Sequence, residues 1–210
     1  MFSLLDYLFP KTSLSGEEGE WVTQQECAAL RTSPIIFDRT MLQKEGIAHL
    51  DRLVVGSSYA HNPFLKKAVW TMKFRRIPAL SVQLGNILCD GVKHLHVQES
   101  VLIPVPLHWS RRFHRGFNQA ELLANSVSKR YCISIVHALR RVRATGYQSH
   151  RTRVERRTAL HGAFRVCATV PPHIILIDDI ATTGATLDAC AAVLKQAGAQ
   201  YVEGWVVARG

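Results

Sequence analysis

The chain has 210 residues, of which 47% are hydrophobic and 20% are charged, a composition that is ordinary for a globular protein and gives no sign of disorder or of a fibre. No apolar run approaches the roughly 18 residues needed to cross a bilayer, so we expect no membrane span. The five cysteines are scattered without close pairs, which argues against a disulfide framework and favours a reducing, cytoplasmic location. The formal net charge of +10 indicates an anionic partner.

The beginning of the chain differs in pattern from the remainder. Residues 1–49 show poor periodicity, and we predict that they form a small appendage to a main domain over residues 50–210. The main domain is predicted to open with a strand at Leu53–Tyr59, which includes β-branched residues. A helix is then expected to begin at Asn62-Pro63, because asparagine suits the N-cap and proline the first turn, and to continue to about Phe74.

The rest of the chain alternates predicted strands and helices. The helices are expected at Pro78–Leu88, Gln119–Tyr131 and Leu187–Ala197, and the strands at Val101–Val105, Ile174–Ile177 and Val202–Val207. The run Ile174–Ile177 is apolar throughout, as in a parallel strand that is covered on both faces. This alternation predicts an α/β fold, with right-handed βαβ units and a parallel sheet flanked by helices. Trp70 and Trp205 lie in apolar patterns and are interpreted as core residues.

Arginines gather in two regions of the chain. Between Arg140 and Arg157 there are seven arginines and one acid. A second cluster, just upstream, consists of Arg111, Arg112 and Arg115. The arginine clusters have three possible interpretations: a solvated basic face, a polyphosphate site or a nucleic-acid site. Composition does not distinguish between them.

The segment from Ile174 to Thr186 carries the strongest functional signal. It predicts a buried strand that presents two adjacent carboxylates, Asp178 and Asp179, at its carboxyl end, where ligands bind in open α/β sheets. Burial of two carboxylates at the end of a strand costs free energy unless they have a partner. Small residues in the following loop would let an anion approach backbone N–H groups at a helix N-terminus, and hydroxyls there could donate to phosphate oxygens. The small residues are Ala181, Gly184 and Ala185, and the hydroxyls belong to Thr182, Thr183 and Thr186.

Other phosphate-binding motifs are excluded. The chain contains neither the G-x-x-x-x-G-K-[ST] pattern of a P-loop nor the G-x-G-x-x-G pattern of a dinucleotide site. By contrast, the four apolar residues, two acids and Thr-Thr-Gly-Ala-Thr loop resemble, along their full length, the phosphoribosyl-pyrophosphate signature of type I phosphoribosyltransferases. This resemblance implies a type I phosphoribosyltransferase-like fold. It also implies that Asp178 and Asp179 are the catalytic acid pair on the ribose hydroxyls, and that Ala181 to Thr186 bind the 5-phosphate.

Further segments resemble the ComF/GntX family within that superfamily. They are Lys73-Phe74, Ile103–His108, Arg115–Ala124, Arg140–Arg143, Gln148, Glu155–Arg157 and Gly162–Phe164. The resemblance implies that Lys73, Arg115 and the Gly116 backbone bind pyrophosphate. It also implies a mobile loop over the site, at about residues 144–160, with contributions from Gln148, Arg151, Arg153, Arg156 and Arg157.

The N-terminal appendage departs from the family pattern. Members of the family commonly begin with a four-cysteine zinc module that opens with a Phe-Pro-x-Cys-x-x-Cys-like run. Here Phe9-Pro10 is followed by Thr12 and Ser15, and Cys27 is the one cysteine of this region. Because a structural zinc site needs about four ligands of the Cys or His type, we expect the appendage to bind no metal.

The resemblance implies a protein that binds 5-phosphoribosyl-1-pyrophosphate, with Mg²⁺ held through that substrate, and that is linked to DNA uptake (competence). As an enzyme it would displace pyrophosphate from C1 of the ribose with a nitrogen nucleophile. The alternative is a non-catalytic, ligand-gated module that binds single-stranded DNA or a helicase-like partner. Against the DNA reading of the Arg140–Arg157 stretch, Tyr147 is its one aromatic residue, whereas platforms for single strands interleave aromatic and basic side chains.

Overall fold

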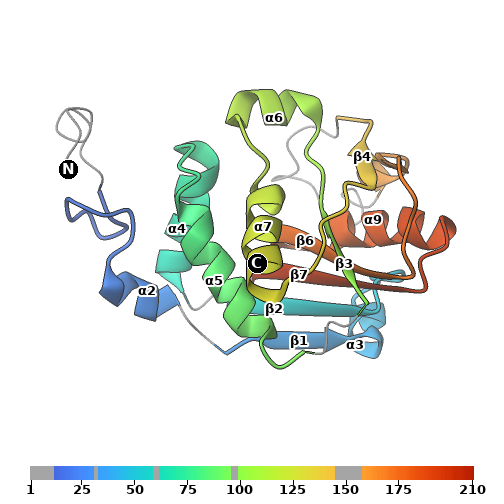
Figure 1. The fold of residues 1–210 in the computed structure, drawn as a ribbon, viewed down its shortest axis with the longest axis horizontal. Coiled ribbons are helices and arrows are strands. Elements are labelled where there is room, and N and C mark those ends of the chain that lie inside the picture. Colours follow the sequence, from blue (N-terminus) through green and yellow to red (C-terminus); the bar gives the residue numbers. More distant parts are fainter. Residues whose placement is uncertain (1–11, 31–32, 59–61, 96–98, 145–157) are drawn as a thin grey trace.

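A computed structural model describes residues 12–30, 33–58, 62–95, 99–144 and 158–210 (Figure 1). Its helices are α2 (Gln24–Leu30), α3 (Arg39–Lys44), α4 (Pro63–Phe74), α5 (Leu80–Val92), α6 (Trp109–Arg115), α7 (Gln119–Tyr131) and α9 (Ala185–Gln196). Its strands are β1 (Ile35–Asp38), β2 (Arg52–Ser58), β3 (Val101–Pro104), β4 (Leu139–Arg141), β5 (Phe164–Val166), β6 (His173–Ala181) and β7 (Tyr201–Arg209).

The centre of the fold is a five-stranded sheet with the strand order β1-β2-β7-β6-β3. The pairs β2–β7, β7–β6 and β6–β3 are parallel, and only the β1–β2 pair at the edge is antiparallel. Helices α4, α5 and α7 cover one face of the sheet, and α9 covers the other (Figure 1). This mixed architecture with a mostly parallel sheet confirms the predicted fold class.

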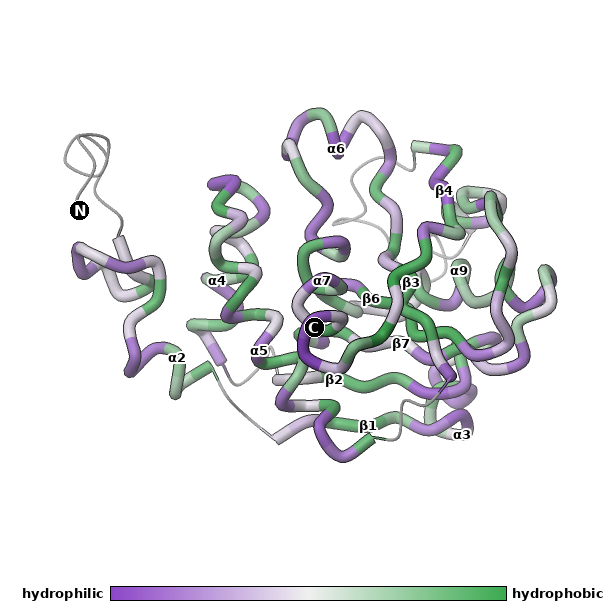
Figure 2. Tube along the Cα trace, in the orientation of Figure 1, coloured by the Kyte–Doolittle hydropathy of each residue, from purple (hydrophilic) through white to green (hydrophobic). Residues whose placement is uncertain are grey.

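The core lies on both faces of the central strands. Ile174, Ile175, Leu176 and Ile177 of β6 are fully buried, and Figure 2 shows hydrophobic residues along these strands. Alternate residues of β6 join the two separate apolar clusters above and below the sheet. A strand in this position needs a continuous apolar run rather than an alternating one, which is why the sequence indicates it so clearly.

Two helices begin where the sequence predicts, because asparagine caps them. The side chain of Asn62 accepts a hydrogen bond from the N–H of Leu65 at the start of α4. The side chain of Asn118 accepts one from the N–H of Ala120 at the start of α7. Each cap satisfies an N–H group that has no partner within its helix.

The interpretation of the tryptophans was correct for one and wrong for the other. Trp205 of β7 is fully buried, whereas Trp70 of α4 is 51% exposed. The buried residues of α4 are Leu65, Ala68, Val69, Thr71 and Met72. Trp70 follows Val69 by one position, and a step of one residue turns a helical side chain by about 100°, so Trp70 faces outward.

Part of the segment assigned to the N-terminal appendage lies in the main body of the structure. Strand β1 pairs with β2, with Ile35 opposite Val55, and Leu42 and Ile47 are fully buried in the cluster on the α9 face. Residues 12–30 pack against the other face, where Leu14, Val22 and Leu30 join the cluster that includes α4. The poor periodicity of residues 1–49 predicts a domain boundary at residue 49. The contacts of the described part of this region with the sheet are long-range, and long-range contacts leave no periodic signal in the sequence.

Within the described residues, none of the helices combines the length and apolar character that crossing a membrane requires.

Candidate functional site

A pocket of about 310 Å³ lies at the carboxyl ends of strands β3 and β6. Its lining residues come from segments far apart in the sequence: α4, the β3–α6 loop, α6, the start of α7, β4, the end of β6, the β6–α9 loop and the start of α9. The lining residues are Lys73, Val105, Pro106, Leu107, Arg111, Arg115, Asn118, Gln119, Arg141, Asp178, Asp179, Ile180, Thr182 and Thr186. Ligands of open α/β sheets bind at this edge, and the pocket therefore lies where the motif predicts a site.

The two acids form one side of this pocket. Strand β6 extends to Ala181, so Asp178 and Asp179 belong to the strand itself, and both line the pocket. Asp179 is buried, and its Oδ2 lies 2.8 Å from Nζ of Lys73 on α4. Burial, together with the neighbouring Asp179 carboxylate, raises the pKa of Asp178 to about 7, although the positive charge of Lys73 opposes the shift. Asp178 can therefore change its protonation state near neutral pH.

The threonine-rich turn joins β6 to α9. Gly184 lies in the left-handed region with φ of 71°, directly before Ala185 opens the helix. A Cβ atom at this position would crowd the side chain of the fully buried Ile47, and the positive φ by itself favours glycine. The side chains of Thr182 and Thr186 line the pocket, and the N–H of Ala185 donates to Thr183 Oγ1 at 3.4 Å. This turn directs hydroxyl groups and a helix N-terminus toward the pocket, an arrangement suited to an anion.

Arginine side chains from two elements line the same pocket. On α6, Arg115 donates to Gln119 Oε1 at 3.1 Å and lies over the ring of Phe74, with 5.8 Å from its Cζ to the ring centroid. On β4, Arg141 is half-buried, and burial together with the nearby positive charge of Arg111 lowers its pKa. Two like charges brought together in a partly buried pocket favour the binding of an anion between or beside them.

Arg111 and Arg141 are site residues that the sequence pattern does not single out. Both belong to arginine clusters, but nothing in a run such as Arg140-Arg141 indicates which residue faces a pocket. Successive residues of a strand point to opposite sides, so Arg140 is exposed while Arg141 lines the pocket. The partner strand β5 fixes this choice, since Arg141 pairs with Phe164 and its guanidinium lies 5.3 Å from the Phe164 ring centroid.

The other predicted residues that the structure describes, Gly116, Ala181, Thr183, Gly184 and Ala185, are not among those that line the pocket. Ala181 and Ala185 are buried in the turn. Gly116 caps the C-terminus of α6 with φ of 81°, and its N–H donates to the carbonyl oxygen of Arg112. The predicted loop residues Gln148, Arg151, Arg153, Arg156 and Arg157 fall outside the described part of the chain.

No protein-family model matches the chain, but curated proteins do. It is 33% identical over 165 residues to the DNA utilization protein YhgH of Escherichia coli K12, an alignment that covers 75% of this chain and 72% of that protein. It is 33% identical over 113 residues to competence protein F of Haemophilus influenzae, covering 51% of this chain and 49% of that protein. It is 28% identical over 183 residues to competence protein ComFC of Streptococcus pneumoniae, covering 87% and 79%.

Proposed function

This chain belongs to the ComF family, and from that premise we propose that it binds 5-phosphoribosyl-1-pyrophosphate in the pocket at the end of β6 and acts in DNA uptake. The observation that carries the proposal is the mixed charge of the pocket. Two carboxylates, three arginines and a lysine line one hollow together with two threonines. A ligand that has ribose hydroxyls and two anionic groups is complementary to such a lining.

In this proposal the acid pair holds the ribose. Asp178 and Asp179 are adjacent on β6, and both line the pocket. The oxygens of these carboxyl groups accept hydrogen bonds, so they suit the donor hydroxyls of a ribose ring. The ion pair of Asp179 with Lys73 then orients one of these carboxylates at its buried position.

The two anionic ends of the ligand are assigned to different parts of the lining. The 5-phosphate would accept hydrogen bonds from Thr182, Thr186 and the N–H groups at the start of α9. The pyrophosphate would pair with Arg111, Arg115 and Arg141, because arginine forms short, charge-assisted and often bidentate bonds to phosphate.

The residues present fit Mg²⁺ held mainly through the ligand. Throughout the described ranges, no three His, Cys, Asp or Glu side chains form a group that could hold a metal. Magnesium is commonly bound by one or two carboxylates plus substrate phosphates, and Asp178 and Asp179 offer two carboxylates. When bound, the ion would offset negative charge on the pyrophosphate.

The same lining supports a displacement at C1 of the ribose. The C1–O bond to pyrophosphate would break, pyrophosphate would leave with the electron pair, and a nitrogen nucleophile would form the new bond. Positive charge that develops on the ribose ring would be stabilised by the carboxylates of Asp178 and Asp179. Negative charge on the departing pyrophosphate would be stabilised by Arg111, Arg115 and Arg141.

Calorimetric titration of the full chain with 5-phosphoribosyl-1-pyrophosphate and Mg²⁺ tests this proposal. We expect saturable binding by the wild type and none by the Asp178→Asn/Asp179→Asn variant, which removes both charges but preserves side-chain shape. Asp90→Asn is the matched control, because Asp90 lies on α5 and its charge pairs with Arg130 at the surface. It should bind like the wild type. No binding by a folded wild-type chain, or equal binding by the double variant, would show that the proposal is wrong.

The role in DNA uptake is supported by the names of the relatives, which describe DNA utilization and competence. Deletion of the gene, and its replacement with the Asp178→Asn/Asp179→Asn allele, would test that role through the frequency of transformation or growth on DNA. We expect both strains to be defective.

A further inference from the structure

Arg115 lines the pocket from a helix that gives it little support. It is the last residue of α6, a helix of seven residues of which none is buried, and Gly116 ends the helix directly after it. A long side chain loses rotamer freedom when it is fixed in one position. A site that uses the guanidinium of Arg115 must therefore hold it through contacts with other elements.

Two residues from other elements contact this guanidinium. Phe74, the last residue of α4, lies against it, with 5.8 Å between Arg115 Cζ and the centroid of the phenyl ring. Gln119, the first residue of α7, accepts a hydrogen bond from Arg115 NH1 through its Oε1 at 3.1 Å. One hydrogen bond uses one of the five N–H donors of a guanidinium, so these contacts are compatible with the binding of an anion by the others.

Phe74 is placed for this contact rather than for the core. It is 55% exposed, and the face of an aromatic ring attracts a guanidinium through the ring quadrupole. The preceding residue, Lys73, lies 2.8 Å from Asp179 through its Nζ. Two consecutive residues of α4 therefore hold two charged groups of the pocket, the Asp179 carboxylate and the Arg115 guanidinium.

Gln119 is anchored with its amide oxygen toward Arg115. It is 2% exposed and follows Asn118, whose Nδ2 donates to the carbonyl oxygen of Val105 at 3.1 Å. Because a guanidinium only donates, the oxygen of the amide must face it. Nε2 of Gln119 is then buried without an acceptor among the residues that the structure describes, which costs free energy. Such a placement is explained by a role at the site better than by core packing.

We propose that Phe74 and Gln119, here called the Arg115 clamp, are positioning residues that fix the guanidinium of Arg115 for the pyrophosphate of the ligand. The identity of this anion rests on the proposed function. A guanidinium that is already fixed loses little further freedom when the ligand binds, so more of its charge-assisted hydrogen bonding contributes to affinity. Phe74 does not line the pocket, and it therefore acts through Arg115.

A double-mutant cycle with Arg115→Ala tests the clamp. The full chain is titrated by calorimetry with 5-phosphoribosyl-1-pyrophosphate and, separately, with inorganic pyrophosphate, each with Mg²⁺. We expect Phe74→Leu to weaken both affinities by roughly 3- to 10-fold, in the range of a lost cation–π contact, and Phe74→Tyr to bind like the wild type because it keeps the ring. With Arg115→Ala already present, Phe74→Leu should have no further effect, because the two residues act as a unit. Gln119→Leu should behave like Phe74→Leu.

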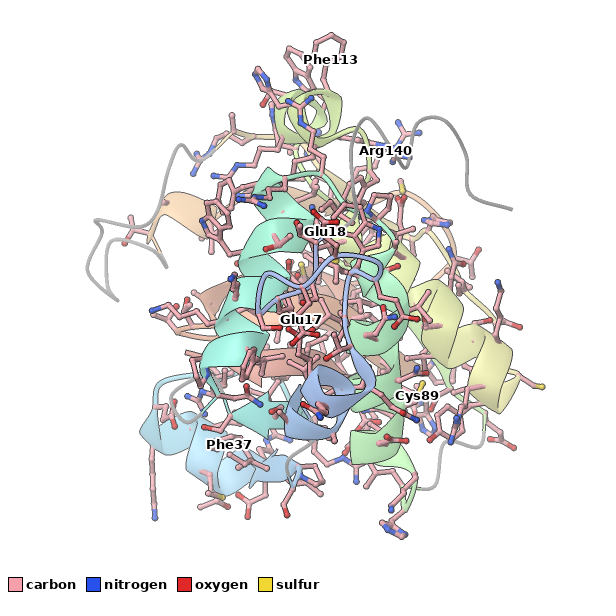
Figure 3. The ribbon with its side chains drawn as sticks, turned by 90° about the vertical axis from the view of Figure 1, so that its left-hand side faces the viewer. Glu17, Glu18, Phe37, Cys89, Phe113 and Arg140 are labelled. Atoms are coloured by element: carbon pink, nitrogen blue, oxygen red, sulfur yellow. The ribbon has the colours of Figure 1, made fainter. Side chains whose placement is uncertain are left out.

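Phe113→Leu is the matched control, because Phe113 is an exposed phenylalanine of α6 that does not line the pocket and lies at the outer end of the molecule (Figure 3). It should bind both ligands like the wild type. The clamp would be overturned by full affinity in Phe74→Leu, by equal losses in Phe74→Leu and Phe74→Tyr, or by an equal loss with and without Arg115. A wild-type chain that binds inorganic pyrophosphate but not 5-phosphoribosyl-1-pyrophosphate would contradict the proposed function, and the cycle on pyrophosphate would still decide on the clamp. A wild-type chain that binds neither ligand would contradict both.

Discussion

Asp178 is a residue whose charged form is disfavoured by its surroundings. Burial and the carboxylate of Asp179 raise its pKa from 3.8 to about 7. Between about pH 4 and pH 7 the folded chain therefore holds a proton that the unfolded chain has released. The free energy of unfolding consequently falls as the pH rises through this window, because stability decreases wherever the folded state binds more protons. A loss of folding stability of this kind is expected at a site that is shaped to bind a ligand.

Asp178→Asn should stabilise the chain at pH 8, since the amide keeps the shape and the acceptor oxygen but carries no charge. We expect a gain on the order of 1–3 kcal/mol in the free energy of unfolding at pH 8 and a smaller gain at pH 5. Urea unfolding at the two pH values measures it. Asp90→Asn should show no gain at either pH, because its partner is a surface arginine and such pairs contribute about 0–1 kcal/mol. A loss of stability in Asp178→Asn at pH 8 would show that the charge of Asp178 does not destabilise the folded chain.

At the residue scale the sequence predicts motif residues better than their neighbours. Asp178 and Asp179 could be placed at a sheet edge because a continuous apolar run and two acids are local signals. The contact of Asp179 with Lys73 joins residues more than a hundred positions apart, and no local pattern encodes it. The same holds for Arg141, whose orientation depends on its pairing with β5.

The junction between β6 and α9 is the element that shapes the proposed phosphate site. Gly184 turns the chain with a positive φ, and Ile47, from the loop after α3, packs directly against it. Ile47 is fully buried, so its side chain has little room to move. The turn and the loop after α3 therefore support each other.

Gly184→Ala should destabilise the chain through both backbone strain and crowding. An alanine Cβ would lie 2.4 Å from Ile47 Cδ1, and a left-handed alanine costs about 1–2 kcal/mol by itself. The matched control is Gly162→Ala, because Gly162 has a similar φ of 66° but its added Cβ would meet no atom within 4 Å. We expect Gly162→Ala to cost about 1–2 kcal/mol, and Gly184→Ala to cost clearly more and to weaken ligand binding as well. Equal losses of stability in urea unfolding would show that Ile47 does not restrict the turn.

At the element scale, local signals predict α4, α7 and β6, and they fail for α6 and for β4–β5. Asparagine caps and apolar stripes mark the first two helices. Helix α6 has seven residues and none of them is buried, so no core-facing stripe marks it in the sequence. Strands β4 and β5 have three residues each and depend on pairing with one another across the predicted loop. Elements that are stabilised by tertiary contacts leave little trace in a sequence pattern.

For the whole molecule, the N-terminal region raises the question of where the independently folding unit begins. Strand β1 covers the edge of β2, and Leu42 and Ile47 fill the cluster on the α9 face. Residues 12–30 instead contribute Leu14, Val22 and Leu30 to the outer side of the α4 cluster. Removal of the two segments should therefore have different consequences for the fold.

A chain that begins at Ser33 should still unfold cooperatively, whereas a chain that begins at Leu50 should not. The shorter deletion removes three buried apolar side chains from one cluster, but it also removes residues whose ordering costs conformational entropy, so the net loss should be a few kcal/mol, on the order of one or two buried leucines. The melting temperature should fall by roughly 5–10 °C. The longer deletion also exposes the apolar strand β2 as a new edge, which favours aggregation, and removes Ile47 from the turn at Gly184. Calorimetric unfolding of both chains measures the difference. A cooperative transition in the chain from Leu50 would place the boundary at residue 49, as the sequence pattern predicts, and would mean that β1 and α3 only cover a sheet that is stable without them.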